Sequence, residues 1–324
     1  MFPAVAWPLL GPLVLVGLLG LGLSHGACDQ FVLPAIGQVR GHQTTYFVRF
    51  TLGYLSLAAA AGLGWWLWPG TAVSLFFLLT VWHWGSADAP PQPGQRPLWV
   101  LHSVLRGTLL FAVPLRWWPG ELPHHVNGLL AFAGALPLDP AWFTRLAVGL
   151  WPLVVAGHLG LWGYYAFQGA TQRWRTDMGE VGLLLALFLT LPPLLALGVY
   201  FVFWHSLQHI LRLNRVFGYA TGVGRSRSWT ILGREVAFFT QRALPSLGLS
   251  LLVPAGLYLL LPARLVGGNN LLAIAVVTAA LLTLPHALLV SLALDAVNWR
   301  SPSPDHLPLR IGALREQPGA TTPS

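Results

Sequence analysis

The chain has 324 residues, of which 55% are apolar and only 9% are charged. An ordinary soluble protein carries about 25% charged residues, so this composition argues against soluble domains and indicates a membrane protein. The net charge is +8, and every basic residue other than histidine is arginine. The lack of lysine excludes chemistry that needs a lysine amine, such as a Schiff base with retinal. The arginines lie between apolar runs, which argues against a nucleic acid partner.

Long apolar runs predict helices that cross a lipid bilayer, since one span needs about 20 apolar residues. The runs are continuous and do not alternate, so we expect helices rather than a closed barrel. The sequence therefore predicts an all-α, polytopic transmembrane bundle of eight to ten spans. In chain order these cover residues 3–25, 46–68, 70–88, 98–114, 124–137, 145–168, 180–213, 236–261 and 270–294. Of these, 124–137 is short, and Pro192-Pro193 makes 180–213 either one kinked helix or two segments.

The domain organisation follows from the same runs. Residues 1–299 are predicted to form one transmembrane domain, and residues 300–324, rich in Pro, Ser and Thr, a disordered tail. A basic loop, opposed only by Glu235, is expected to face the cytoplasm by the positive-inside rule; its arginines are Arg212, Arg215, Arg225, Arg227 and Arg234. We expect a multi-pass protein of the cell membrane. Its single cysteine, Cys28, excludes an intrachain disulfide and a cysteine-based metal site.

Histidines within the apolar runs are the main candidates for chemistry, because an imidazole exposed to lipid is costly and is expected to face the bundle interior. His205 and His209 are four residues apart, which places them on one helix face with Cβ atoms about 6 Å apart. Both imidazoles can then reach one metal ion. The commoner role of a single histidine in a span is a hydrogen bond to a neighbouring helix, and that role is expected for His102 and His158.

Two further histidines share a local pattern. His25 and His83 both end an apolar run, and Gly-x-x-Asp follows each of them, at 26–29 and at 85–88. Glycine lets helices approach closely, so it can bring imidazoles toward a shared ion, although ordinary helix packing uses small residues in the same way.

The order of the spans predicts that these histidines converge. One span separates the run that ends at His25 from the run that ends at His83, so both histidines lie near the same membrane face. His205 and His209 reach that face as well if 124–137 crosses the bilayer fully. We therefore expect four imidazoles from three helix ends to meet at the cytoplasmic side, from His25, His83, His205 and His209.

Carboxylates are expected close to such a site, because neutral imidazoles leave a divalent ion with its full charge. Asp29, Asp88 and Glu180 are candidates for bonding the outer nitrogen of a ligating imidazole. Asp29 follows His25 by four residues and shares its helix face if the helix continues. Asp29 and Asp88 could equally be solvated residues beyond a span end. His286, inside the last apolar run, is a further candidate for the surroundings of the ion.

Four motifs in order carry a family resemblance. They are His-Gly-Ala-Cys-Asp at 25–29, His-Trp-Gly-Ser-Ala-Asp at 83–88, Tyr-Phe…Trp-His-Ser…His at 200–209 and Thr-Leu-Pro-His at 283–286. As an ordered set, this resembles the Brp/Blh family of bacteriorhodopsin-related membrane proteins, which act as β-carotene 15,15′-dioxygenases. The chain departs from the family pattern at Gln30 and Gln208, neither of which is an expected ligand.

The resemblance implies an Fe(II) enzyme that cleaves the central double bond of β-carotene with O2 to give two all-trans-retinal molecules. It places the iron ligands on four histidines, with no other cofactor; these are His25, His83, His205 and His209. Imidazole suits Zn, Cu, Fe and Ni alike, so iron is implied by the family and not by the ligand type. A functional link to a retinal-binding rhodopsin is a further implication. Nearby aromatic residues are candidates to hold the polyene: Trp82, Trp84, Phe201, Phe203 and Trp204.

Two other functions remain open from the residues alone. A membrane di-iron desaturase or hydroxylase also uses His-x-x-x-His pairs, but such sites need about eight histidines in boxes that this sequence lacks. A non-enzymatic carotenoid-binding or transport protein is the other alternative, since transporters often have broken helices in two matched halves.

Overall fold

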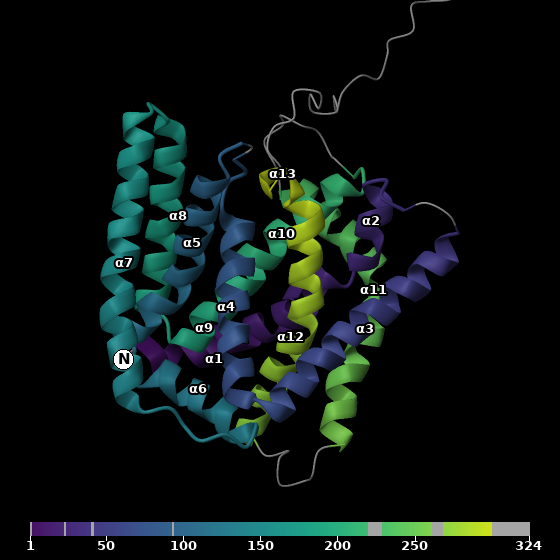
Figure 1. Cartoon of the computed structure of the whole chain (residues 1–324), viewed down its shortest axis with the longest axis horizontal. Helices are drawn as coiled ribbons and strands as arrows, with labels where there is room; N and C mark the ends of the chain where they lie inside the picture. The colour runs from purple at the N-terminus through teal and green to yellow at the C-terminus, as the bar shows by residue number, and fades with distance from the viewer. Residues whose placement is uncertain are drawn as a thin grey trace, which may run out of the picture.

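The computed structural model describes residues 2–299, apart from residues 23, 40, 41, 93, 220–228 and 261–267. Over these residues every regular element is a helix (Figure 1), so the predicted all-α class is confirmed for this part of the chain. Arg225 and Arg227 of the basic loop, and the predicted tail at 300–324, lie outside the described residues.

The helices fall into long rods and short turns. The long helices are α1 (Phe2–Gly17), α3 (Gln43–Leu67), α4 (Pro69–Asp88), α5 (Arg96–Trp117), α6 (Glu121–Phe132), α7 (Pro140–Phe167), α8 (Thr171–Thr190), α10 (Leu207–Val216), α11 (Trp229–Leu260) and α12 (Gly268–Leu289). The shorter elements are η1 (Leu18–Gly22), η2 (Ser24–Gly26), η3 (Asp29–Phe31), α2 (Val32–Ala35), α9 (Pro193–Val199), η4 (Tyr200–Ser206), η6 (Val290–Leu294) and α13 (Ala296–Trp299). Short π-helical or 3₁₀-helical segments therefore interrupt the regular helices, mainly after α1, between α9 and α10, and after α12.

Five described helical segments are long and apolar enough to cross a membrane. They are Gln43–Leu67, Arg96–Trp117, Pro140–Phe167, Pro193–Val216 and Ala273–Leu294. The predicted count of eight to ten spans is not confirmed. The predicted span at 124–137 is wrong, because α6 has only 12 residues and is therefore about 18 Å long, well short of the bilayer core of about 30 Å.

The apolar run predicted at 180–213 is two segments. Helix α8 ends at Thr190, and α9 begins at Pro193 after a turn in which Pro192 is extended. The predicted order thus has one crossing too many at 124–137 and one reversal too few at 180–213. These two departures cancel, so the predicted direction of the segment that carries His205 is unchanged. The α9–α10 segment therefore runs in the same direction as α4, and α12 does so as well (Figure 1). Their carboxyl-terminal halves lie at the same end of the bundle.

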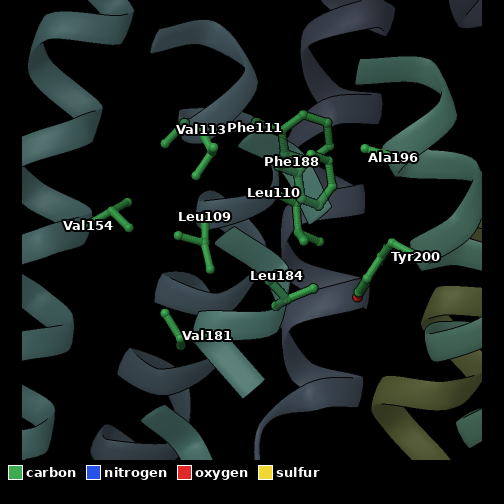
Figure 2. Close-up of a cluster of buried hydrophobic side chains, with 11 residues drawn as sticks. Leu109, Leu110, Phe111, Val113, Val154, Val181, Leu184, Phe188, Ala196 and Tyr200 are labelled. Carbon is green, nitrogen blue, oxygen red and sulfur yellow. The ribbon is translucent and has the colours of Figure 1, made fainter. Parts of the chain in front are cut away.

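Helix α5 is the most buried of the five candidate spans and contacts α4, α7 and α8. Its apolar residues pack with side chains of α7, α8, α9 and η4 in the cluster drawn in Figure 2, which includes Leu109, Phe111, Val154, Leu184, Phe188 and Tyr200. Tyr200 is the first residue of η4, so this cluster anchors the segment that carries His205.

Helices α4 and α5 are in backbone contact. A Cβ atom added at Gly85 would meet the carbonyl oxygen of Ser103, and one added at Gly107 would meet the carbonyl oxygen of Val81. Gly85 thus has the close-packing role that the sequence suggested, although its neighbour is α5 and not another histidine-bearing helix. The contact fixes the stretch of α4 on both sides of His83.

Candidate metal centre

Five imidazoles meet in one cluster. His25 comes from η2, His83 from α4, His205 from η4, His209 from α10 and His286 from α12. The ring centroid of His25 lies 5.5 Å from the centroids of both His205 and His209, and 4.9 Å from the centroid of His286. The centroid of His83 lies 5.0 Å from that of His205 and 4.9 Å from that of His286. The structure thus brings together the four histidines predicted from the sequence and adds His286, which the sequence predicted only for the surroundings of the ion.

These separations suit ligands of a single ion. An imidazole nitrogen binds an ion such as Zn²⁺ at about 2.0–2.1 Å, which places the ring centroids of two ligands on one ion roughly 4.5–6.5 Å apart. All the recorded pairs fall in that range, including the stacked pair His205 and His209 at 6.5 Å. Ligand atoms of His25, His83 and His205 lie within 4.8 Å of one another, and so do those of Asp29, His209 and His286.

Unpaired nitrogens are the strongest sign that the cluster holds a cation. Both ring nitrogens of His83, His205 and His209, and Nε2 of His286, are buried with no hydrogen-bond partner among the described residues. Leaving one buried polar atom unsatisfied costs about 1–3 kcal/mol, and native structures contain few such atoms. So many in one place, all from a residue type that ligates metals, fit a divalent ion bound between them.

The protonation state of His25 is set by the turn that carries it. Its Nδ1 lies 2.5 Å from the carbonyl oxygen of Gly22. A carbonyl oxygen only accepts, so Nδ1 carries the proton and donates it, and Nε2 keeps its lone pair for a cation. The chain leaves the regular helix after Gly17 and passes through η1 and η2, which turns this imidazole into the bundle.

A wide helical turn carries His205. The η4 segment, Tyr200–Ser206, is a π-helix, a rare element that is frequent at functional sites. His209 follows in the regular helix α10. The rings of His205 and His209 are nearly parallel, with 12° between their planes. The two histidines therefore face the same way, as their spacing predicted, although the helix between them is not uniform.

Asp29 binds an imidazole of the cluster, but not through the helix geometry that the sequence suggested. The helix does not continue from His25 to Asp29, because a turn at residues 27–28 separates η2 from η3. Asp29 instead accepts a hydrogen bond from Nδ1 of His286 at 2.8 Å. The Tyr54 hydroxyl lies 3.3 Å from the same carboxylate.

The other two candidate carboxylates have different neighbours. Asp88 accepts a hydrogen bond from the Tyr200 hydroxyl at 2.9 Å, while its second oxygen has no partner in the described part of the chain. Glu180 forms an ion pair with Arg106 on α5. Asp88 therefore lies beside the segment that holds His205, and the recorded ion pair of Glu180 belongs to a separate cluster.

That separate cluster was not predicted from the sequence. Arg106 is only 1% exposed, and it donates to Asp177 at 2.9 Å. His102 lies 2.7 Å from the same carboxylate through Nε2, so the hydrogen bonding expected for this histidine is present. His158 instead bonds the carbonyl oxygen of Val154 in its own helix, α7, and not a neighbouring helix as expected. A signal was available for this cluster, because an arginine inside an apolar run needs a buried partner.

Cys28 lies beside the cluster but is unsuited to binding a soft metal. Burial and the neighbouring Asp29 carboxylate raise the pKa of its thiol to about 12. In the absence of a metal ion this residue is a neutral, packed thiol, and it belongs to neither group of clustered ligand atoms among the described residues. The nearby donors are imidazoles and carboxylates, a set that suits divalent first-row metals.

Comparison with known proteins identifies the family. The family model described as β-carotene 15,15′-dioxygenase matches residues 16–293. The chain belongs to this family, and is an enzyme of that class. The matched range contains all five clustered histidines, and the resemblance found in the sequence motifs is confirmed.

Relatives of this chain carry names that agree with this family. The chain is 31% identical over 283 residues to the probable β-carotene 15,15′-dioxygenase Blh of Halobacterium salinarum, covering 83% of this chain and 80% of the relative. It is 24% identical over 272 residues to the β-carotene 15,15′-dioxygenase of uncultured marine bacterium 66A03, covering 83% of this chain and 89% of the relative. A search of solved structures found no significant match.

Proposed function

We propose that this protein is a membrane-embedded, Fe(II)-dependent dioxygenase that cleaves the 15,15′ double bond of β-carotene with O2 to give two molecules of all-trans-retinal. The observation that carries the proposal is the buried set of unpaired imidazole nitrogens within the matched range of the family. Family membership supports the reaction, and the imidazoles supply a site for the ion that the reaction needs.

The proposed iron ligands are four imidazoles, from His25, His83, His205 and His209. The bound iron would supply the activation of O2 beside the alkene. Asp29, Asp88 and Glu180 remain proposed as residues that orient the ligands or balance charge, with Asp29 best supported by its bond to His286. Each half of the polyene receives one oxygen atom, so the overall reaction takes no proton or electron from outside.

The residues around the imidazoles suit an apolar substrate. The ring of Phe201 stacks on that of His205 with a centroid distance of 5.8 Å, and the ring of Trp84 lies 5.8 Å from that of His205. Phe201 also meets the ring of His25 edge-on at 5.3 Å. These flat side chains would hold the polyene against the ion and exclude water. The roles in substrate binding predicted for Trp82, Phe203 and Trp204 remain predictions.

The proposed location is the cell membrane, with the iron site toward the cytoplasm. Large apolar side chains are exposed on the outer helices, among them Leu52, Leu63 and Leu153, so the surface is suited to lipid. β-Carotene dissolves in the bilayer and can enter from there. Arg212 and Arg215 follow the cluster on α10, and the positive-inside rule assigns that end to the cytoplasm.

Variants of the paired histidines test the proposal. His205→Ala and His209→Ala should each abolish iron retention and retinal formation, because each removes a ligand, while the protein still inserts. Iron is measured in the purified protein, and retinal by chromatography after expression in cells that accumulate β-carotene. His158→Ala is the matched control, since His158 is an equally buried histidine that bonds its own helix. Wild-type iron content and retinal yield in both ligand variants would refute the proposal.

The same cells separate the alternative functions. Cleavage turns orange cells pale and yields retinal, whereas a desaturase or hydroxylase changes the carotenoid without shortening it. A binding or transport protein would leave the carotenoid intact and needs no stoichiometric iron. Family membership favours cleavage over both. A link to a retinal-binding rhodopsin follows only if retinal is made.

A further inference from the structure

We propose that His286 is itself a ligand of the metal ion, held in place by Asp29, so that five imidazoles and not four surround the ion. This deepens the proposed function and depends on it. His286 lies near the carboxyl end of α12, far in sequence from the other ligands. The sequence predicted this residue only for the surroundings of the ion, because it has no histidine partner at helical spacing.

The position of the His286 ring supports the assignment. Its centroid lies 4.9 Å from those of His25 and His83 and 5.1 Å from that of His209. The two distances of 4.9 Å are shorter than any recorded between the four histidines proposed as ligands, of which the shortest is 5.0 Å between His83 and His205. The residue is only 4% exposed. A ring that lay behind the ligands, bonding their outer nitrogens, would have hydrogen bonds to them, and its Nε2 has none within the described residues.

Asp29 fixes which nitrogen of His286 can bind a cation. Both carboxylate oxygens lie within hydrogen-bond distance of Nδ1, at 3.0 and 2.8 Å. A carboxylate accepts, so Nδ1 carries the proton and Nε2 keeps its lone pair. Metal-ligating histidines commonly donate their second nitrogen to a carboxylate in this way, which orients the ring and raises its basicity. His286 is therefore arranged as a ligand and Asp29 as its positioning residue.

The surroundings of this pair keep it in one arrangement. Asp29 is 2% exposed and lies within 3.3 Å of the Tyr54 hydroxyl of α3. At Gly26, an added Cβ would lie 3.4 Å from Nδ1 of His286 and 3.9 Å from a carboxylate oxygen of Asp29. The backbone at Gly26 therefore packs directly against the pair.

Metal affinity and its rescue test the proposal. The full-length protein in detergent is stripped with a chelator, and its affinity for Fe(II) is measured without oxygen by chelator competition. His286→Gly should weaken Fe(II) binding more than Asp29→Asn does, and Asp29→Asn should weaken it about 10–100-fold. Millimolar free imidazole should restore binding to His286→Gly by filling the vacated position, and should not restore it to Asp29→Asn. His158→Gly is the control, because it removes a buried imidazole outside the cluster.

Two results would overturn the assignment. One is wild-type affinity in Asp29→Asn, an isosteric change that keeps the proposal testable even if His286→Gly does not fold. The other is a folded His286→Gly variant whose weakened binding does not respond to imidazole. Failure of the proposed function is distinct: the wild type would then bind no stoichiometric iron, and His205→Ala would change nothing. If iron is lost in His205→Ala but kept in His286→Gly, the proposed function stands and only the assignment of His286 as a fifth ligand is wrong.

Discussion

The backbone contact between α4 and α5 predicts an unusual sensitivity at Gly85. Gly85→Ala would place a methyl group against the carbonyl oxygen of Ser103 and 2.8 Å from the amide nitrogen of Gly107. Both obstacles are backbone atoms of α5, the most buried of the candidate spans, so neither can rotate away. The two helices must separate, and His83, two residues before Gly85, must move with α4.

The size of the effect follows from two opposing terms. Alanine is favoured over glycine inside a helix by about 1 kcal/mol. Overpacking a well-packed contact costs about 1–3 kcal/mol and sometimes more, and a rigid backbone obstacle places this site at the upper end. We expect a net loss of about 2 kcal/mol in the free energy of unfolding, together with weaker iron binding, because the His83 ring leaves the cluster.

The assay compares Gly85→Ala with Gly160→Ala. Gly160 lies on the exposed face of α7 with nothing within 4 Å of an added Cβ, so that variant should be as stable as the wild type or more stable. Unfolding in detergent and iron per folded protein are measured for both. Gly107→Ala tests the same contact from α5, since its Cβ would meet Val81. If Gly85→Ala unfolds like the control and keeps its iron, the inference of a rigid contact that positions His83 is wrong.

Two further predictions concern buried polar groups outside the set of five imidazoles. Asp177→Asn should destabilise the fold by about 3 kcal/mol, the lower end for breaking a buried ion pair, because Glu180 still pairs with Arg106; chemical unfolding measures it, and iron per folded protein should stay at the wild-type level. Tyr200→Phe removes the recorded hydrogen-bond donor to Asp88 and should cost about 1–3 kcal/mol, and an unchanged unfolding midpoint would show that the bond contributes nothing.

The helical class and the meeting of four histidines were predicted from features that repeat along the chain. Apolar runs mark helices, and the ends of successive spans alternate between the two membrane faces. The predicted meeting depended on 124–137 crossing the bilayer, which it does not. It was correct because the turn at Pro192 reverses the chain once more, so the direction of the segment carrying His205 is unchanged.

The features that the sequence did not predict depend on contacts between distant segments. His286 and Asp29 are separated by 257 positions, and no local pattern links an aspartate in a turn after α1 to a histidine in α12. The same holds for His102 on α5 and Asp177 on α8, which are in direct contact although they are far apart in sequence. Helical spacing even favoured the wrong partner for Asp29, since it predicted His25 on the assumption of a continuous helix.

Three of the five imidazoles lie in an irregular segment or are held by a residue of such a segment. His25 lies in a tight turn after the π-helical η1, and His205 lies in the wide turn η4 that leads into His209. His286 is held by Asp29, which belongs to the short turn η3. Such segments are less stable on their own than an α-helix, so their neighbours must hold them. The cluster on α5 includes Tyr200 of η4, while η2 contacts α10 and α11, and η3 contacts α3. His83 and His209 lie on the regular helices α4 and α10, and the position of α4 is set by the glycine contact. The site therefore requires both parts of the fold: irregular turns that direct imidazoles inward, and a close helix pair that gives them a fixed reference.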